Sequence, residues 1–190
     1  MTVKMIVAVD RDSAIGWEDG HLPWKISADM KRFKELTTGS TVLMGRKTFE
    51  SLGRPDGLPN RQNVVLTSDS AKRTPHGVHP VWFKDGTDSL KTFVQAHQAC
   101  LGCDPGDLWI IGGATVYDEA LRMKLVDEIY LTIVDVTSGA DVTVSYDLSS
   151  WKLFILRQQK DGVKWYLQSI SDPQTTDGVT FTFVHLKRTR

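Results

Sequence analysis

Short, continuous apolar segments recur along most of the chain, and segments with helical spacing separate them. The helical spacing occurs at Ser27–Leu36, at Leu90–Leu101 and in the residues after Gly113. Strands that are apolar throughout and are joined through helices are typical of a parallel sheet covered on both faces. The predicted strands of this kind are Met5–Val9, Thr41–Met44, Asn63–Leu66, Val78–Phe83, Leu108–Ile111 and the longer Glu128–Val136.

The pattern changes from Trp151 onward. We predict three further strands separated by turns, at Trp151–Gln158, Gly162–Ser169 and Val179–Lys187. Strands joined by short turns indicate antiparallel pairing. The sequence therefore predicts one α/β domain over residues 1–190, with a central mixed sheet that is mostly parallel, an antiparallel C-terminal end and helices on both faces.

Composition limits the possible partners. The 190 residues carry 23 basic and 23 acidic side chains, so no net charge draws the protein to nucleic acid or to an anionic membrane. We find no membrane-spanning run and no signal peptide, and we expect a cytoplasmic monomer. The two cysteines, Cys100 and Cys103, lack the second pair that a structural zinc site requires, and we predict no metal site.

The segment Leu22–Asp29 predicts a loop that enters a helix, with Ser27 as the N-cap. On this helix Asp29, Phe33 and Leu36 share one face. Asp29 therefore lies at the border of an apolar face, beside a loop that contains Trp24. Spacing alone leaves two interpretations open, a charge at the start of a helix and a buried working carboxylate.

Two glycine-containing turns follow predicted strands and open helices, which is where ligands bind in open α/β sheets. Gly112-Gly113-Ala114-Thr115 suits a phosphate about as well as it suits a simple tight turn. Gly45-Arg46-Lys47-Thr48 favours the phosphate, because two cations would otherwise oppose the helix dipole. Thr67 and Ser68 add hydroxyl groups at the end of a neighbouring strand.

Three more polar side chains are candidates on weaker grounds. Arg54 and Arg61 suit a carboxylate ligand, although surface charge is the ordinary explanation for such residues. Thr132 is a polar residue in a strand built for burial. It either bridges Asp29 to a ligand or is a β-former tolerated at that position.

Taken together, these segments resemble the dihydrofolate reductase family over essentially the whole chain. No single motif is specific, but their number and order are. The matching pieces are Ile6-Val7-Ala8-Val9-Asp10, Ile15-Gly16, Leu22-Pro23-Trp24, Ser27-Ala28-Asp29, Met44 to Ser51, Gly53-Arg54-Pro55, Leu58-Pro59-Asn60-Arg61, Ile111 to Tyr117 and Tyr130-Leu131-Thr132.

The resemblance implies an NADPH-dependent oxidoreductase that reduces 7,8-dihydrofolate to 5,6,7,8-tetrahydrofolate, with a hydride to C6 and a proton to N5. Such an activity supports one-carbon metabolism and thymidylate synthesis. It also implies binding of antifolates such as methotrexate or trimethoprim. Two rivals stay open, a related reductase acting on a ribosylated pyrimidine in riboflavin synthesis and a nucleotide-binding scaffold without activity.

The resemblance also implies roles for individual residues. Asp29 would hold the 2-amino group and N3 of the pterin, and Trp24 and Thr132 would orient it. The substrate side would comprise Ile6, Ala8, Asp29, Phe33, Leu52, Arg54, Leu58, Arg61 and Thr132. The cofactor side would comprise Ala8, Ile15, Gly16, Gly20, Leu22, Arg46, Lys47, Thr48, Leu66, Thr67, Ser68, Lys84, Ile111, Gly112, Gly113, Ala114, Thr115, Val116 and Tyr117.

Two local features follow from the same resemblance. Gly112 and Gly113 match a pair that the family joins by a cis peptide bond. Residues 16–22 match a loop that closes over the nicotinamide, but here the loop has one residue more than the commonest bacterial form. Thr115 is uncharged where some members carry arginine, so the sequence does not identify the partner of the 2′-phosphate.

Overall fold

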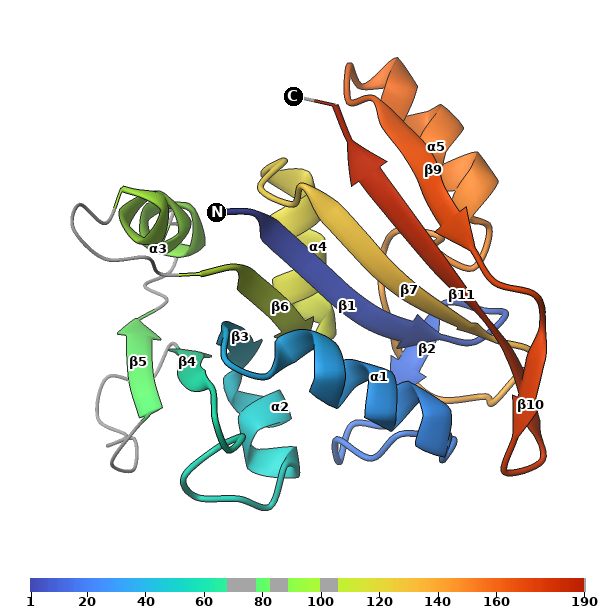
Figure 1. Cartoon of the computed structure of the whole chain (residues 1–190), viewed down its shortest axis with the longest axis horizontal. Helices are drawn as coiled ribbons and strands as arrows, with labels where there is room; N and C mark the ends of the chain where they lie inside the picture. Colours follow the sequence, from blue (N-terminus) through green and yellow to red (C-terminus); the bar gives the residue numbers. More distant parts are fainter. Residues whose placement is uncertain (68–77, 83–88, 100–105, 190) are drawn as a thin grey trace.

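The computed structural model describes residues 1–67, 78–82, 89–99 and 106–189, and one twisted sheet runs through them with helices on both faces (Figure 1). The strands are β1 (Val3–Val9), β2 (Ala14–Gly16), β3 (Thr41–Gly45), β4 (Gln62–Thr67), β5 (Val78–Trp82), β6 (Leu108–Gly112), β7 (Glu128–Val134), β8 (Val142–Thr143), β9 (Trp165–Ile170), β10 (Gln174–Thr176) and β11 (Val179–Arg188). The helices are α1 (Ser27–Thr37), α2 (Arg46–Ser51), α3 (Ser89–Gln98), α4 (Ala114–Arg122) and α5 (Trp151–Lys160).

The predicted mixed sheet is confirmed. Its strand order is β10-β11-β7-β1-β6-β3-β4-β5, and β9 pairs with β11 beside β10. The strands from β7 to β5 are parallel, whereas β11 runs antiparallel to β7 and pairs antiparallel with β9 and β10. The carboxyl ends of the parallel strands therefore lie along one edge. A small second sheet pairs β2 with β8.

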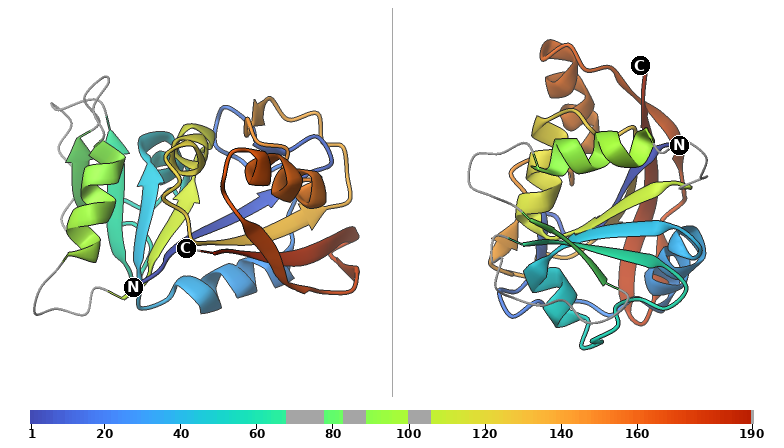
Figure 2. Two further views of the ribbon diagram at one scale, coloured as in Figure 1. Left: turned by 90° about the horizontal axis from the view of Figure 1, so that it is seen from above. Right: turned by 90° about the vertical axis from the view of Figure 1, so that its left-hand side faces the viewer.

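The parallel strands β1, β3, β4, β6 and β7 are largely buried on both faces, which is why their sequences are mainly apolar. On one face Ile6, Val42 and Trp109 pack against side chains of α1 and α2. On the other face Met5, Leu43 and their neighbours pack against α3, α4 and α5. Figure 2 shows α1 and α4 on opposite sides of the sheet.

One predicted strand is wrong. Residues 151–158 begin α5, a helix that runs from Trp151 to Lys160. Phe154 and Gln158 are buried at helical spacing, and Leu153 and Leu156 are exposed. A short apolar run fits either period, and the straight-chain Leu, Gln, Lys and Arg that fill this segment are good helix formers. The residues Lys160–Gly162 therefore end a helix and do not form a turn between two strands.

The predicted N-cap is also wrong. Ile26 occupies the N-cap position of α1, and no side chain of that residue caps the helix. Ser27 is the first helical residue, and its backbone N–H donates to Asp177 Oδ2 at 2.8 Å. Asp177 lies in the turn between β10 and β11, where it and Gly178 both have positive φ. The partner of the helix start thus comes from the far end of the chain.

Some residues named in the predictions lie outside the described ranges, and one predicted helix differs from the observed helix only at its ends. Phe83, Ser68, Lys84 and both cysteines fall outside those ranges. The helix predicted from Leu90 begins at Ser89 and ends at Gln98. Within the described ranges, no helix is long and apolar enough to cross a membrane. No group of three or more His, Cys, Asp or Glu side chains there is placed to hold a metal ion.

Candidate active site

Asp29 lies in the first turn of α1 and reaches across to β7. Thr132 Oγ1 donates a hydrogen bond to Asp29 Oδ1 at 2.6 Å. Both residues are on the sheet face that α1 covers, because Leu131 and Ile133, the neighbours of Thr132 in β7, belong to the cluster on the opposite face. The two polar residues left ambiguous by the sequence are therefore partners.

Burial raises the pKa of the Asp29 carboxyl, because a charge in apolar surroundings loses its hydration. The hydrogen bond from Thr132 and the positive charge of Arg32 oppose this rise without cancelling it. A raised pKa in a cleft is typical of a carboxyl group that takes part in proton chemistry. The two interpretations of Asp29 are compatible, since the same residue lies in the first turn of a helix and is a partly buried acid.

Trp24 is buried, with 8% of its surface exposed, and packs against Ile26, Val134 and Phe181. Its Nε1 is buried and has no hydrogen-bond partner among the described residues. Ala28, which precedes Asp29, packs against the same cluster. A buried donor without a partner costs free energy, so a bound water or ligand group is the expected partner of Trp24 Nε1.

Four of the predicted apolar substrate residues are brought into one cluster. Ile6 comes from β1, Phe33 from α1, Leu52 from the end of α2, and Leu58 from the loop that follows. Ala8, two residues beyond Ile6 on the same face of β1, packs with Trp24 in the neighbouring cluster. These side chains thus belong to two apolar clusters on the sheet face that α1 covers.

Arg61 and Arg54 have different surroundings. Arg61 Nε donates to Thr37 Oγ1 at 2.9 Å, and its Nη atoms donate to Pro59 O at 3.0 Å and Lys34 O at 3.4 Å. These partners are neutral, so the guanidinium is held in place at the end of α1 while its charge is not balanced by them. Arg54 is exposed.

The two glycine-containing turns meet at the carboxyl edge of the sheet. The Gly112–Gly113 peptide is cis, as the resemblance implies. A side chain at Gly113 would place its Cβ 3.2 Å from Thr48 Oγ1, and one at Gly45 would lie 3.3 Å from Val116 Cγ2. The helix after Gly113 has no side-chain cap. Its first amide groups therefore face an edge where backbone can approach a ligand closely.

Not every predicted cofactor residue is free to bind. Tyr117 is buried, and its hydroxyl donates to Ile6 O at 2.7 Å, which ties α4 to β1. Arg46 pairs with Glu50 at 2.8 Å along α2. Lys47 and Thr115 are exposed, whereas Leu66 and Thr67 are buried at the end of β4.

The loop before α1 packs against α2. A Cβ at Gly20, where φ is +88°, would meet Ser51 Cβ at 2.3 Å, so only glycine fits there. Ile15 and Gly16 form part of β2, and Leu22 is 48% exposed. An open cavity of about 530 Å³ also lies against this loop. Its lining includes Trp17, Trp24, Ser138 and Val179.

Arg32 escapes prediction from sequence. It lies one turn after Asp29, and its Nη1 donates a long hydrogen bond to Thr132 Oγ1 at 3.5 Å. Its guanidinium carbon lies 4.2 Å from the centre of the Phe183 ring. The i, i+3 spacing from Asp29 was the available signal, but its contacts with Thr132 and Phe183 depend on the folded sheet.

Comparisons with known proteins agree with this geometry. The family model described as dihydrofolate reductase matches residues 2–172. The chain is 36% identical to a dihydrofolate reductase of Staphylococcus aureus over 154 residues, 80% of this chain and 84% of the relative. It is 29% identical over 185 residues to a bifunctional dihydrofolate reductase-thymidylate synthase of Paramecium tetraurelia, 97% of this chain and 34% of the relative.

A solved structure is similar as well. It is a dihydrofolate reductase from Enterococcus faecalis complexed with NADP(H) and RAB-propyl. The match has a TM-score of 0.74 and 26% identity, and it covers 100% of this chain and 97% of the other. A family match over most of the sequence and a fold match over all of it have the same meaning: this chain belongs to the dihydrofolate reductase family.

Proposed function

We propose that this protein reduces 7,8-dihydrofolate to 5,6,7,8-tetrahydrofolate with NADPH, and that Asp29 is its catalytic carboxylate. The observation that carries the proposal is the hydrogen bond from Thr132 to the partly buried Asp29, on the sheet face that holds the predicted apolar substrate residues. The overall reaction consumes one NADPH and one proton. A hydride adds to C6, a proton adds to N5, and NADP⁺ is left.

Asp29 orients the substrate in this proposal. A carboxylate accepts two parallel hydrogen bonds, which suits the 2-amino group and N3–H of a pterin. Thr132 uses its hydroxyl hydrogen on Oδ1. The carboxylate is thereby held in one rotamer, and its remaining lone pairs are free to accept from the substrate. A positioned acid of this kind contributes about 100-fold to 10,000-fold in rate.

Trp24 would help to hold the water that delivers the proton. Its buried Nε1–H has no partner in the described residues, and it would donate to a water held near Asp29. Such a water can pass a proton toward N5, while the surrounding apolar side chains keep bulk water out. Asp29 acts on that water by its charge and need not touch N5.

The apolar surface and Arg61 account for the rest of the substrate. Ile6, Phe33, Leu52 and Leu58 would line the pterin and aminobenzoyl rings. Arg61 is anchored through neutral partners, so its charge is available to the α-carboxylate of the glutamate tail. Arg54 would lie at the rim.

The residues present fit a bound NADPH. Small residues surround the Gly112–Gly113 turn, Thr48 offers a hydroxyl group, and the uncapped start of α4 favours an anionic pyrophosphate. Bound there, the dihydronicotinamide would supply the hydride. The loop from Gly16 to Leu22 would cover that ring and exclude water, and it already contacts α2 through Gly20. Tyr117 would hold the turn in place through the hydrogen bond from its hydroxyl group to Ile6 O.

We further propose that residues 1–190 form one domain, that the protein acts as a cytoplasmic monomer, and that methotrexate and trimethoprim occupy the dihydrofolate site. The single continuous sheet supports one domain. Light scattering tests the monomer. Because a ligand that binds only the native state stabilises it, each antifolate should raise the melting temperature of the wild type.

The decisive experiment follows the absorbance of the reduced nicotinamide with dihydrofolate present. We expect oxidation of NADPH that is faster than oxidation of NADH in the same assay. Asp29→Asn should lose most of this activity, and Asp12→Asn, an exposed acid in a turn, should retain it. Activity on a ribosylated pyrimidine but not on dihydrofolate would contradict the proposal, as would wild-type turnover by Asp29→Asn at neutral pH.

A further inference from the structure

Two aromatic rings hold the Arg32 guanidinium beside the Asp29–Thr132 pair. Its guanidinium carbon lies 4.2 Å from the Phe183 ring centre and 5.6 Å from the Tyr130 ring centre. Phe183 comes from β11 and Tyr130 from β7, so the cation lies over two neighbouring strands of the sheet. Such contacts hold a guanidinium in one place, because the ring faces are electron-rich.

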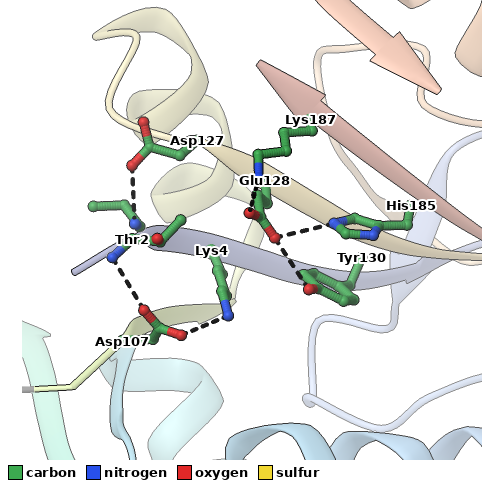
Figure 3. A network of polar contacts seen from close by, with 9 residues as sticks. Thr2, Lys4, Asp107, Asp127, Glu128, Tyr130, His185 and Lys187 are labelled. Carbon is green, nitrogen blue, oxygen red and sulfur yellow. Dashed lines mark hydrogen bonds and ion pairs between the residues drawn. The ribbon is translucent and has the colours of Figure 1, made fainter. Parts of the chain in front are cut away.

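The Tyr130 ring is itself held in place by His185 and Glu128. Its ring centre lies 4.1 Å from that of His185, and the two rings are stacked. The Tyr130 hydroxyl donates to Glu128 Oε2 at 3.0 Å, and His185 Nε2 lies 3.1 Å from the same oxygen (Figure 3). The surface under Arg32 is thus fixed by a hydrogen-bonded group of side chains that the reaction itself does not use.

The hydrogen-bond chemistry gives the Thr132 hydroxyl a direction. Arginine has N–H donors and no acceptor. When Arg32 Nη1 approaches Thr132 Oγ1 at 3.5 Å, the hydroxyl oxygen accepts, and its hydrogen is left for Asp29 Oδ1 at 2.6 Å. A hydroxyl donor and a nearby positive charge both favour the ionised carboxylate.

We propose that Arg32 is a positioning residue of this active site, which orients the Thr132 hydroxyl toward Asp29 and stabilises the ionised form of the Asp29 carboxylate. The proposal rests on the role proposed above for Asp29. It assigns to this chain a cation that controls the pH range of the catalytic acid without touching substrate or cofactor.

The other groups that face Asp29 and Arg32 do not perform this task. Tyr117 on α4 is the further titratable group near Asp29, and burial raises its pKa, so it stays neutral. Burial raises the pKa of Tyr130 to about 12, so it is neutral as well. Burial lowers the pKa of His185 although Glu128 opposes this effect, so His185 is mainly neutral at neutral pH. Arg32 is therefore the group whose positive charge acts on Asp29.

The first test measures the pKa of Asp29 directly, by NMR of protein labelled with carbon-13 in the aspartate carboxyl groups, without any ligand. Asp29→Asn assigns the signal. Arg32→Met keeps an unbranched stem against Phe183 and removes the charge, and it should raise the pKa of Asp29 by about 1. Arg32→Gln, which retains an N–H donor, should give a smaller rise. Arg32→Lys should remain close to the wild type.

Lys31→Met is the matched control. Lys31 lies beside Arg32 on α1, but its side chain is 78% exposed and pairs with Glu35 at 3.9 Å. Its removal subtracts the same charge from the same helix, and it should leave the pKa of Asp29 unchanged. The proposal is overturned if Arg32→Met and Arg32→Gln both leave that pKa at the wild-type value, or if Arg32→Lys raises it as much as Arg32→Met. Melting curves show which of the two uncharged variants, Arg32→Met and Arg32→Gln, is folded and can be used for the comparison.

The second test records the pH profile of kcat/KM with dihydrofolate. In Arg32→Met its midpoint should move upward by the same amount as the NMR value, and Lys31→Met should match the wild type. An NMR shift without a matching shift of the profile would leave the electrostatic role of Arg32 intact and refute Asp29 as the catalytic acid. A shift of neither would refute the role of Arg32. The two proposals can therefore fail separately.

Discussion

Asp29 on α1 and Glu128 on β7 are acids at the same face of the sheet, Asp29 partly buried and Glu128 buried, and their surroundings differ. Glu128 accepts from the Tyr130 hydroxyl, lies 3.1 Å from His185 Nε2 and pairs with Lys187 at 3.3 Å. Among the described residues, Asp29 accepts a hydrogen bond from Thr132 alone. Burial alone would raise both pKa values, but the partners of Glu128 lower its pKa below the ordinary value. That of Asp29 stays raised.

The difference separates a structural acid from a working one. Glu128 has its lone pairs satisfied by the protein, so it stabilises the fold and has little capacity left for a ligand. Within the described residues Asp29 accepts only the Thr132 bond, which leaves acceptor lone pairs for a substrate. Strand β7 therefore borders two kinds of acid, distinguished by the number of their partners.

The largest effect is expected for Asp29→Asn. Because the amide cannot act as the catalytic carboxylate, kcat/KM at neutral pH should fall about 100-fold or more. Activity should partly recover at low pH, where the substrate arrives protonated. Steady-state assays across the acidic and neutral range check this outcome. A flat pH profile would remove the distinction between the two acids.

Glu128→Gln should affect stability and not catalysis. The variant weakens hydrogen bonds to a buried charge, so the free energy of unfolding should fall by about 2 kcal/mol, while kcat stays close to the wild type. Urea titration measures the loss. Glu35→Gln removes an exposed acid of α1 and should change stability by less than about 0.5 kcal/mol. A stability loss in both variants would show that burial of Glu128 is not the cause.

The two acids should give opposite pH dependences. The folded pKa of Glu128 lies below the ordinary 4.5, so the stability that it contributes is present above 4.5 and is lost as the pH falls through the folded pKa. The folded pKa of Asp29 lies above 3.8, so the wild type gains stability relative to Asp29→Asn as the pH falls through that pKa toward 3.8. Thermal melts of the wild type and both variants test the two signs. The same sign for both would contradict the comparison.

Tyr130→Phe should give the smallest effect. It removes the hydroxyl donor to Glu128 at 3.0 Å and keeps the ring under Arg32. We expect a loss of about 1 kcal/mol in the free energy of unfolding and an unchanged pKa for Asp29. Urea titration and the NMR measurement check these two values. A changed Asp29 pKa would mean that the Tyr130 hydroxyl, and not its ring, fixes Arg32.

Local signals predicted the parts of the site that depend on local backbone. The glycine turns at Gly45 and Gly112 follow strands and open helices, and their sequence indicates this directly. Asp29 was predicted as a candidate because of its spacing from Phe33. The pairing of Asp29 with Thr132 could not be decided, since 103 residues separate them and only the sheet brings them together.

The errors have physical causes as well. Apolar and polar residues in 151–158 follow neither the strand period nor the helix period clearly enough to exclude the other. The packing of Phe154 and Gln158 in the folded protein is what makes this segment a helix. Ser27 has the chemistry of an N-cap, but a distant aspartate provides the bond that the helix requires. Arg32 was missed because its partners lie on β7 and β11, which no local pattern connects to α1.

The bond between Ser27 and Asp177 has a consequence for synthesis on the ribosome. The first amide of the helix that carries Asp29 receives its partner from a hairpin made 150 residues later. Strand β11, which leads away from that hairpin, also supplies the ring beneath Arg32. A nascent chain that already contains every predicted residue of the active site therefore still lacks the partner of its first helical amide and the ring beneath Arg32.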